Sequence, residues 1–538
     1  MSTTERTVAE AILDQLATWG VRRIYGYAGD AILTFLDAIN CHPKIEYIGT
    51  RHEGAAAFMA SAEAKLTGRV GVCTATSGPG AANLINGLAD AFLDKAPVIA
   101  ITGQVPAKYI GTGYKQYIDE QILLNPVTKY NTLLIDPQPT VEVVYKALQI
   151  AMGQGTVANI SVPKDTFDKP CSTPPRLQDV LFPAHKLPQD QGIKEAINLL
   201  NKAKKPMFLI GRGAQGKGEL VKKLADKLGA AIAYSLPAKG VISSDFKYLV
   251  GGLGLAGTNK ASNLLSEADC LLTIGATWWP QKFVPQEIPI IQLDAILENI
   301  GLQANITLGV EGCIRKALQF ILDGTKAKSN KKWREIISST RKNWLVRLEE
   351  EANANENPIT PQRLVYSVEQ ALDQDAIITL DVGEHVLWFD KMFQGKGQNI
   401  LISGSWRSMG FGLPAALSAQ LEFPKRQVVT LMGDGGFTMS MPELVTAVEK
   451  GLAVKVVVFN NKYLSMEKNR MIVSGLSQTG TNLYNPDFSE VAKACGLEGY
   501  KVADVKELDE VIIKAFKSNK PSLVEVEVSS PIPPHTTL

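Results

Sequence analysis

Two short polar motifs in the C-terminal third of the chain have the residue types to bind a metal ion and a diphosphate. Gly433-Asp434-Gly435-Gly436 directly follows the apolar run 428–432, and Asn460-Asn461 directly follows the run 454–459. Aspartate carboxylates and asparagine carbonyls are hard oxygen ligands that suit Mg²⁺, which takes phosphate oxygens as its further ligands. Glycines allow backbone N–H groups to approach a diphosphate closely. The motifs therefore indicate a magnesium–diphosphate site.

The elements around these motifs would bring them together. The two apolar runs read as parallel strands, and residues 440–450 between them read as a helix. A right-handed crossover places the carboxyl ends of both strands on one edge of the sheet, where ligands bind. Asp434 and Asn461 can then converge although they are 27 positions apart. Either motif alone fits a plain turn, but their joint spacing favours a site.

The N-terminal part of the chain carries a further candidate acid. Arg51-His52-Glu53 follows a strand-like run at 45–48 and precedes an alanine-rich helix. A carboxylate at a helix start is also a common capping choice, so both interpretations stay open. Ser77-Gly78-Pro79-Gly80 and Gly103-Gln104 follow two more strand-like runs, as plain turns or as places where the backbone approaches a ligand.

The pattern from Gly433-Asp434-Gly435 to Asn460-Asn461 resembles the signature of thiamine-diphosphate enzymes. The resemblance implies that Asp434, Asn461 and the backbone carbonyl of Tyr463 bind Mg²⁺. It also implies that Glu53 hydrogen-bonds pyrimidine nitrogen N1′ and favours the imino tautomer that removes the thiazolium C2 proton. Met409 resembles the apolar wedge that bends the cofactor, with a core methionine as the alternative.

The resemblance also implies the remaining contacts. The expected catalytic residues are Glu53, Gln116 and Met409. Contacts with thiamine diphosphate are expected from Gly29, Ser77, Asn83, Gly383, Glu384, His385, Met409, Gly433, Asp434, Gly435, Gly436, Asn461 and Tyr463.

The central part of the chain carries a weaker nucleotide signal. A glycine loop after the strand-like run 206–210 is a weak sign of dinucleotide binding by itself. Together with segments 236–240 and 275–280 and an acid after run 290–293, it resembles the FAD-binding positions of pyruvate oxidase and acetolactate synthase. Some members keep this domain without flavin or bind ADP there, so FAD and its absence both stay open. The implied contacts are Gly211, Gly213, Ala214, Lys239, Gly275, Thr277 and Asp294.

Strand-like runs alternate with helix-like runs in three segments, which predicts an α/β protein with three doubly wound parallel-sheet domains. We place a pyrimidine-binding domain at 1–170, a central nucleotide-binding-like domain at 188–325 and a diphosphate-binding domain at 357–538. The proline-rich stretch 163–191 reads as a linker, and the highly charged stretch 326–356 reads as a solvated helix that joins two domains.

Composition excludes several other classes of protein. The net charge of +2 gives no electrostatic case for nucleic acid, and no apolar run reaches the roughly 20 residues that span a bilayer. A polar N-terminus and six scattered cysteines without a CxxC pair predict a cytoplasmic location. No membrane anchor is visible. Because the resemblance puts Glu53 and Asp434 of different subunits on one cofactor, we expect a homo-oligomer, with a dimer of dimers (a homotetramer) as the usual state.

The amino-acid sequence most resembles those of pyruvate oxidases, including quinone-linked pyruvate dehydrogenase, in fragments such as 483–488. The expected reaction is therefore oxidative decarboxylation of a 2-oxo acid, with pyruvate as the expected substrate. Open alternatives are an acetolactate synthase-type carboligase, a sulfoacetaldehyde acetyltransferase-like enzyme and a non-catalytic protein on this fold.

At three positions this chain carries a residue other than the one usual in the family. Nine positions after Asn461, acetolactate synthases carry Trp and pyruvate oxidases Glu, whereas this chain has Arg470. Lys115 replaces a usual Phe, and Ala28 a usual Pro. We expect Lys115, Glu467 and Arg470 near the substrate. The two cations favour an additional anionic group on the substrate or acceptor, and an ion pair between Arg470 and Glu467 is the alternative.

Overall fold

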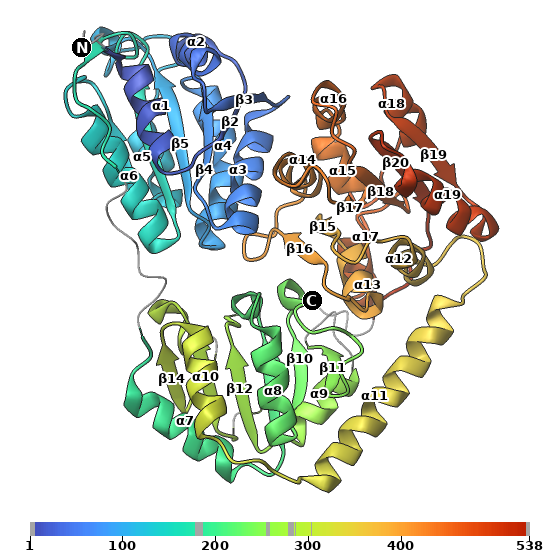
Figure 1. Ribbon diagram of the computed structural model, residues 1–538. Helices are drawn as coiled ribbons and strands as arrows, with labels where there is room; N and C mark the ends of the chain where they lie inside the picture. Colours follow the sequence, from blue (N-terminus) through green and yellow to red (C-terminus); the bar gives the residue numbers. More distant parts are fainter. Residues whose placement is uncertain are drawn as a thin grey trace.

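The computed structural model describes residues 6–177, 187–253, 259–277, 285, 287–302 and 304–533. It contains three six-stranded sheets, and every strand pair in them is parallel (Figure 1). Helices cover both faces of the sheets, so the expected α/β fold with three doubly wound parallel sheets is confirmed. Across the described parts of the chain, no helix is both long enough and apolar enough to cross a membrane.

The N-terminal sheet has the strand order β3-β2-β4-β5-β7-β6. Its two central strands, β4 and β5, are buried along their whole length, as their apolar runs require. The strands are β2 (Arg23–Gly26), β3 (Glu46–Gly49), β4 (Gly71–Ala75), β5 (Val98–Gln104), β6 (Tyr130–Leu133) and β7 (Val157–Pro163). The helices are α1 (Val8–Thr18), α2 (Leu33–Cys41), α3 (Glu53–Thr67), α4 (Pro79–Leu93), α5 (Glu120–Leu124) and α6 (Thr140–Gln154).

The C-terminal sheet has the order β16-β15-β17-β18-β20-β19. Numbered along the chain within each sheet, both orders read 2-1-3-4-6-5, so the outer domains share one topology. The strands are β15 (Ile377–Leu380), β16 (Asn399–Ile402), β17 (Val428–Gly433), β18 (Lys455–Asn460), β19 (Glu498–Val502) and β20 (Ser522–Glu527). The helices are α12 (Pro361–Gln370), α13 (His385–Met392), α14 (Gly412–Glu422), α15 (Asp434–Ser440), α16 (Glu443–Glu449), α17 (Ser465–Val473), α18 (Phe488–Ala494) and α19 (Val505–Lys517).

The central sheet has a different order, β11-β10-β9-β12-β13-β14. Within the domain this order reads 3-2-1-4-5-6, which is typical of dinucleotide-binding folds, whose ligands bind where the order reverses. Its strands are β9 (Pro206–Ile210), β10 (Ala231–Tyr234), β11 (Leu249–Gly252), β12 (Cys270–Ile274), β13 (Ile290–Asp294) and β14 (Leu308–Glu311). Its helices are α7 (Asp190–Lys202), α8 (Gly218–Leu228), α9 (Asn259–Ser266) and α10 (Ile314–Gly324).

Two connecting segments differ from the expectation. The charged stretch forms helix α11 (Lys331–Ala352), which joins the central and C-terminal domains, but it is not simply solvated. Trp333 is buried in the central core and Trp344 in the C-terminal core, because each end of the helix carries an apolar side chain into one domain. Part of the expected linker forms β8 (Pro170–Cys171), which pairs with β1 (Arg6–Thr7); its stretch 178–186 lies outside the described residues.

The outer domains pack against each other through α3 and α14, which lie side by side (Figure 1). Phe58 of α3 meets Phe411 edge-on with the ring centroids 5.7 Å apart. Ser418 Oγ of α14 donates a 2.9 Å hydrogen bond to the backbone carbonyl of Met59. These contacts merge the apolar faces of both domains into one core.

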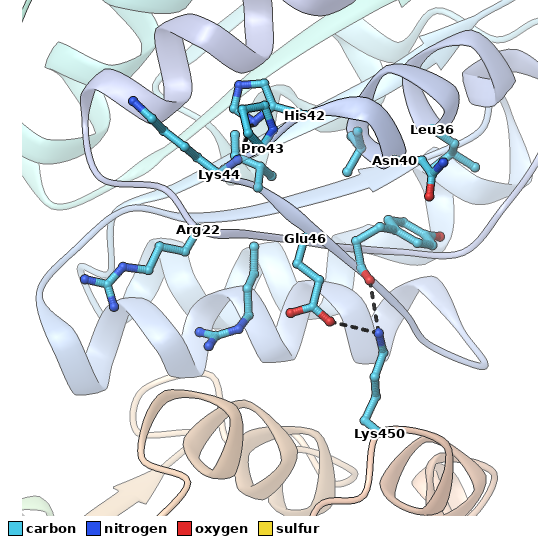
Figure 2. A pocket seen from close by; sticks show the side chains of 12 residues that line it. Arg22, Leu36, Asn40, His42, Pro43, Lys44, Glu46 and Lys450 are labelled. Atoms are coloured by element: carbon cyan, nitrogen blue, oxygen red, sulfur yellow. Dashed lines mark hydrogen bonds and ion pairs between the residues drawn. The ribbon is translucent and has the colours of Figure 1, made fainter.

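An ion pair joins the same two domains further along their contact. Lys450, at the end of α16, has its Nζ 3.0 Å from Glu46 Oε1 and donates a 3.3 Å hydrogen bond to the backbone carbonyl of Tyr47. Figure 2 shows Lys450 reaching toward Glu46. The hollow beside this pair is lined by basic side chains such as Arg22 and Lys44, near the amino ends of β2 and β3. The expected cofactor residues follow the carboxyl ends of strands, so this hollow is separate from them.

Candidate active site

Asp434 lies at the carboxyl end of β17 and is 2% exposed. Its Oδ1 accepts a 2.9 Å hydrogen bond from Gly435 N, and its Oδ2 accepts one of 2.7 Å from Lys462 N. A helix was expected from residue 440, but α15 begins at Asp434 itself, so Gly435 and Gly436 lie in its first turn. A Cβ on Gly436 would collide with the carboxylate of Asp381, which explains why glycine is required there.

The second motif reaches the same point from β18. Asn461 Oδ1 accepts a 3.1 Å hydrogen bond from Tyr463 N, and Lys462 between them has φ +62. Such backbone conformations cost about 1–3 kcal/mol outside glycine and persist where surrounding contacts impose them. Here Leu464 N donates to Thr481 O at 2.8 Å, which ties the loop to the segment that follows. Asp434, Asn461 and Tyr463 are thus brought together.

Asn485 is a site residue that the motif analysis missed. Its Nδ2 donates to Asp434 Oδ2 at 2.8 Å and to Asn460 Oδ1 at 3.0 Å. Asn460 in turn donates to Glu525 Oε1 at 2.7 Å, and Glu525 Oε2 accepts the Phe488 backbone N–H at 2.9 Å. The only signal in the sequence was the family-like fragment 483–488, in which nothing marked Asn485 as a partner of Asp434.

The surroundings of Asp434 fit a divalent cation. Within the described residues, the side-chain and backbone groups that donate hydrogen bonds to its carboxylate are all uncharged. Burial raises its pKa, as expected for a carboxylate taken out of water. The residues described include no group of three or more His, Cys, Asp or Glu side chains able to hold a metal ion. A metal here would therefore need oxygen ligands from amides, carbonyls and a bound diphosphate, as Mg²⁺ prefers.

The segment Gly383–His385 forms the other side of this corner. His385, the first residue of α13, is 5% exposed, and burial lowers its pKa to about 4, so the ring is neutral at pH 7. Its Nε2 has no partner among the described groups. A Cβ on Gly433 would lie 3.3 Å from His385 Nδ1. Glu384 accepts a 2.6 Å hydrogen bond from Asn469 Nδ2, and burial raises its pKa to about 7.

Met409 reaches this corner from the loop between β16 and α14. A Cβ on Gly435 would lie 3.3 Å from Met409 Cε, so the methionine methyl group lies over the first turn of α15. The next backbone amide, Gly410 N, donates to Asp381 Oδ1 at 2.8 Å. Met409 is half-buried, as an apolar surface presented to a ligand would be, and not part of a sealed core.

Glu53 begins α3 on the N-terminal domain, but it does not cap the helix. His52 is the N-cap and its Nδ1 accepts from Gly54 N at 3.0 Å. The Glu53 side chain is free for another role and accepts a 2.9 Å hydrogen bond from Asn83 Nδ2 of α4. Asn83, expected as a cofactor contact, is thus used to orient this buried acid.

The neighbouring loops close in on each other around Ser77 and Gln116. Gly78 has φ +66, and a Cβ there would lie 2.5 Å from the Gln116 carbonyl oxygen. Gln116 itself has φ +62, a conformation that is strained for a side chain of its size. A Cβ on Gly29 would lie 2.5 Å from Thr76 Cβ. The glycines here serve close packing of loops beside Glu53.

Glu120 is a second acid in this region that sequence reasoning missed. It is fully buried, and its Oε2 accepts hydrogen bonds from Thr102 Oγ1 at 2.6 Å and Ser161 Oγ at 2.8 Å. Gly78 N donates to its Oε1 at 3.4 Å. Burial raises its pKa to about 7.

The expected residues thus form two groups. One group surrounds Asp434 at the carboxyl edge of the C-terminal sheet, and the other surrounds Glu53 at the carboxyl edge of the N-terminal sheet. No hydrogen bond or ion pair between described residues links Glu53 to Asp434 within the chain.

In the central domain, the glycine residues meet where the strand order reverses. Gly213 N donates to Gly275 O at 3.0 Å, and a Cβ on Gly211 would collide with that same carbonyl. Ala214 is buried beside them, and Thr277 is half-buried beyond Gly275. Residues 278–280 of the expected segment lie outside the described part of the chain.

The two polar central residues differ in what they contact. Asp294 Oδ1 accepts hydrogen bonds from Ile296 N at 3.0 Å and Asn299 Nδ2 at 3.1 Å, near the carboxyl end of β13. Lys239 was expected to contact a nucleotide, but its side chain is buried against the C-terminal domain. Its buried Nζ is 2.9 Å from Tyr234 Oη and 3.4 Å from Asp390 Oδ1 of the C-terminal domain. A buried ammonium needs a counter-charge, and Asp390 supplies it across the domain contact.

The expected substrate residues lie on different domains. Lys115 is exposed beside Gln116, and Glu467 and Arg470 lie on α17. Arg470 Nη1 is 3.6 Å from Glu467 Oε2, so the ion pair considered as an alternative is present. Both side chains are well exposed, and such a pair contributes little to stability.

Two outer sheets of equal topology, one with a buried acid and one with a corner of oxygen groups that fits a divalent cation, are the arrangement expected of an α/β enzyme with a diphosphate cofactor. Comparisons with known families agree. The chain matches the thiamine pyrophosphate enzyme N-terminal TPP binding domain at residues 6–123, the central domain at 193–321 and the C-terminal TPP binding domain at 381–526. The chain belongs to the thiamine pyrophosphate enzyme family.

Relatives align along nearly the whole chain. A Bacillus subtilis (strain 168) protein, named only as a thiamine pyrophosphate-containing protein, is 33% identical over 98% of this chain and 92% of its own length. The acetolactate synthase isozyme 1 large subunit of Escherichia coli (strain K12) is 30% identical over 97% of this chain and 94% of its own. The acetolactate synthase large subunit of Parasynechococcus marenigrum is 31% identical over 97% and 87%.

Proposed function

We propose that this enzyme decarboxylates a 2-oxo acid with thiamine diphosphate and Mg²⁺ and transfers the remaining acyl unit to a second 2-oxo acid, as a carboligase of the acetolactate synthase type. The observation that carries the proposal is the pair of site halves, Glu53 with Asn83 and Asp434 with Asn461 and Asn485. The acetolactate synthase relatives support carboligation over the pyruvate oxidase chemistry that the sequence text alone favoured.

The residues present would hold the cofactor at both ends. Asp434, Asn461 and the Tyr463 carbonyl would bind Mg²⁺, and the Gly383–His385 segment would line the diphosphate. When bound, thiamine diphosphate supplies a carbon nucleophile and an electron sink for the decarboxylation. Glu53, buried and oriented by Asn83, would hold a proton at the pyrimidine ring nitrogen. Met409 would offer an apolar surface that sets the angle between the two rings.

Because Glu53 and Asp434 lie in separate groups within one chain, the proposal requires a second subunit to complete each site. We propose a homodimer as the smallest active unit and a dimer of dimers as the usual assembly. All six cysteines are free, as is usual in a reducing compartment, which supports a cytoplasmic setting.

Oxidative decarboxylation of the pyruvate oxidase type is the second candidate. The similarity of fragment 483–488 to pyruvate oxidases favours it, whereas Arg470 departs from both the Trp of acetolactate synthases and the Glu of pyruvate oxidases. FAD in the central domain is supported by the 3-2-1-4-5-6 strand order and the glycines at its reversal point. FAD alone does not separate the two candidates, because the same positions resemble both families.

Product analysis tests the proposal. The purified protein would be incubated with pyruvate, Mg²⁺ and thiamine diphosphate, with and without phosphate and an artificial electron acceptor. Acetolactate formed without an acceptor supports carboligation, whereas acetate or acetyl phosphate that requires the acceptor supports oxidation. Absence of CO₂ release from pyruvate and from other 2-oxo acids contradicts both. An absorbance spectrum of the same sample reports bound flavin directly.

A further inference from the structure

The loop that carries Met409, residues 403–411, is held in place by the other outer domain. It connects β16 to α14, and α4 of the N-terminal domain contacts it along one side. Arg407 has φ +55, a backbone conformation that is uncommon for residues other than glycine and that a free chain would seldom keep. Contacts from outside the loop must therefore maintain it.

Asp94, the C-cap of α4, holds the start of the loop. Its Oδ2 accepts a 2.9 Å hydrogen bond from Gly404 N and its Oδ1 accepts one of 2.8 Å from Ser405 N. A Cβ on Gly404 would lie 2.9 Å from Asp94 Oδ1, so a side chain there would force the carboxylate to shift. Hydrogen bonds to a charged acceptor are about twice as strong as neutral ones.

The charge of Asp94 is maintained by a buried lysine. Lys65 Nζ lies 2.6 Å from Asp94 Oδ2 and donates to the carbonyl of Ile402 at 3.3 Å. Burial by itself would raise the pKa of Asp94, but the charges of Lys65 and Arg212, with the hydrogen bonds from Lys65 and Gly404, lower it to about 2. Asp94 is therefore an anion at neutral pH.

Asn86, two turns earlier on α4, holds the middle of the loop. Its Oδ1 accepts a 2.7 Å hydrogen bond from Trp406 Nε1, and its Nδ2 donates to Ser408 Oγ at 3.0 Å. Ser408 precedes Met409, so the last contact is one residue away from the side chain that reaches α15. Asn83, less than one turn from Asn86 on the same helix, orients Glu53.

We infer that Asp94 and Asn86 are positioning residues for the reaction. Through them helix α4 fixes the position of Met409, and the same helix also orients Glu53. This inference rests on the proposed function and deepens it. A role in domain docking alone is the outcome that would refute the inference. The two roles differ in what they predict for turnover when the fold is intact.

The test compares Asp94→Asn with Asp90→Asn in the full-length assembled protein. Both changes remove one carboxylate beside Lys65, because Asp90 Oδ2 lies 2.7 Å from the same ammonium, but Asp90 accepts no hydrogen bond from the loop. We call the hydrogen bonds that Asp94 and Asn86 make to the loop the clamp. Hydrogen exchange of the peptide 403–411 reports whether the clamp is intact. Calorimetry with thiamine diphosphate and Mg²⁺, together with kcat and KM, reports its consequence.

We expect Asp94→Asn to speed exchange of the loop and to lower kcat by roughly tenfold or more, with KM changed much less, because two charge-assisted hydrogen bonds are lost. Asp90→Asn should leave loop exchange and kcat within about twofold of the native values. Asp94→Glu, which keeps the carboxylate, should restore part of the turnover. If Asp94→Asn does not fold, Asn86→Ala tests the same clamp without removing a buried charge, with an expected loss of roughly fivefold.

Faster loop exchange with unchanged kcat and cofactor affinity would refute the positioning role, and unchanged exchange would refute the clamp itself. Equal losses in Asp94→Asn and Asp90→Asn would assign both residues to domain docking alone. If the native protein shows no decarboxylation, the proposed function fails, whereas loop exchange and cofactor affinity still decide the clamp.

Discussion

Asn485 donates a 2.8 Å hydrogen bond to Asp434 Oδ2, although the two residues are 51 positions apart. The same amide contacts Asn460, so it connects the ends of β17 and β18. Through this amide the carboxylate keeps a fixed orientation that a metal ion would require.

Removing either partner should weaken cofactor binding to different extents. Asp434→Ala removes the only carboxylate of the proposed metal site and should abolish Mg²⁺-dependent binding of thiamine diphosphate. Asn485→Ala leaves the carboxylate but frees its orientation, so affinity should fall by roughly tenfold. Calorimetry measures both, with Asn355→Ala, an exposed asparagine away from the site, as the matched control. Unchanged affinity in Asp434→Ala would rule out the metal site.

Glu53→Gln should leave the fold and cofactor binding largely intact and lower turnover by orders of magnitude. The amide cannot hold the proton at the pyrimidine nitrogen as a carboxyl group does, whereas Asn83 can still bond to its oxygen. Exchange of the cofactor C2 proton, followed by NMR, measures the effect directly. Glu63→Gln makes the same change further along α3, where the acid bonds Tyr25, and should leave C2 exchange unchanged. Near-normal C2 proton exchange in Glu53→Gln would contradict the assignment of Glu53 as the activating acid.

Complementation tests the shared site. Glu53→Gln and Asp434→Ala should each be inactive as pure proteins. When the two are co-expressed, half of the sites in a mixed dimer carry both changes and the other half carry none. Random mixing should then restore about a quarter of native turnover. Mixed protein that stays inactive, or an active monomer by light scattering, contradicts a site formed between subunits.

Charge reversal tests the substrate proposal at Arg470. If Lys115 and Arg470 attract an extra anionic group, the native enzyme should turn over doubly anionic 2-oxo acids relatively well, and Arg470→Glu should shift preference toward pyruvate. The ratio of kcat/KM values for the two substrates is the measurement. Because Glu467 already pairs with Arg470, Glu467→Gln should shift the ratio the other way. Strong preference for pyruvate with no change in Arg470→Glu would show that the ion pair is only a surface contact.

The raised pKa of Glu120 predicts that the stability of the fold depends on pH. Its pKa in the folded protein is about 7, above the ordinary value for a glutamate near 4.3. Between these values the folded state binds a proton that the unfolded state has lost, so the free energy of unfolding falls as pH rises through this window. The loss is on the order of 2–3 kcal/mol. Glu120→Gln should flatten the decline in denaturant unfolding measured from pH 5 to pH 8, since Thr102 and Ser161 hydroxyls can turn to accept from the amide. A variant with the same slope as the native protein contradicts the shift.

The sequence by itself determined the sheets and the meeting of the Asp434 and Asn461 motifs. Strand β9 begins and ends where its apolar run does, and β13, β17 and β18 lie within one residue of theirs, because a buried parallel strand must be apolar along its whole length. The crossover rule then placed Asp434 and Asn461 together without any long-range information.

Only the tertiary structure decided which distant side chains meet. The partner of Asp434 at Asn485, the pairing of Lys239 with Asp390 and the hold of Asp94 on the loop before Met409 all join segments that share no local pattern. Periodicity reports whether a residue is buried, but not which group lies opposite it. A buried charge or amide must find a partner, and the packing of whole domains determines which one is within reach.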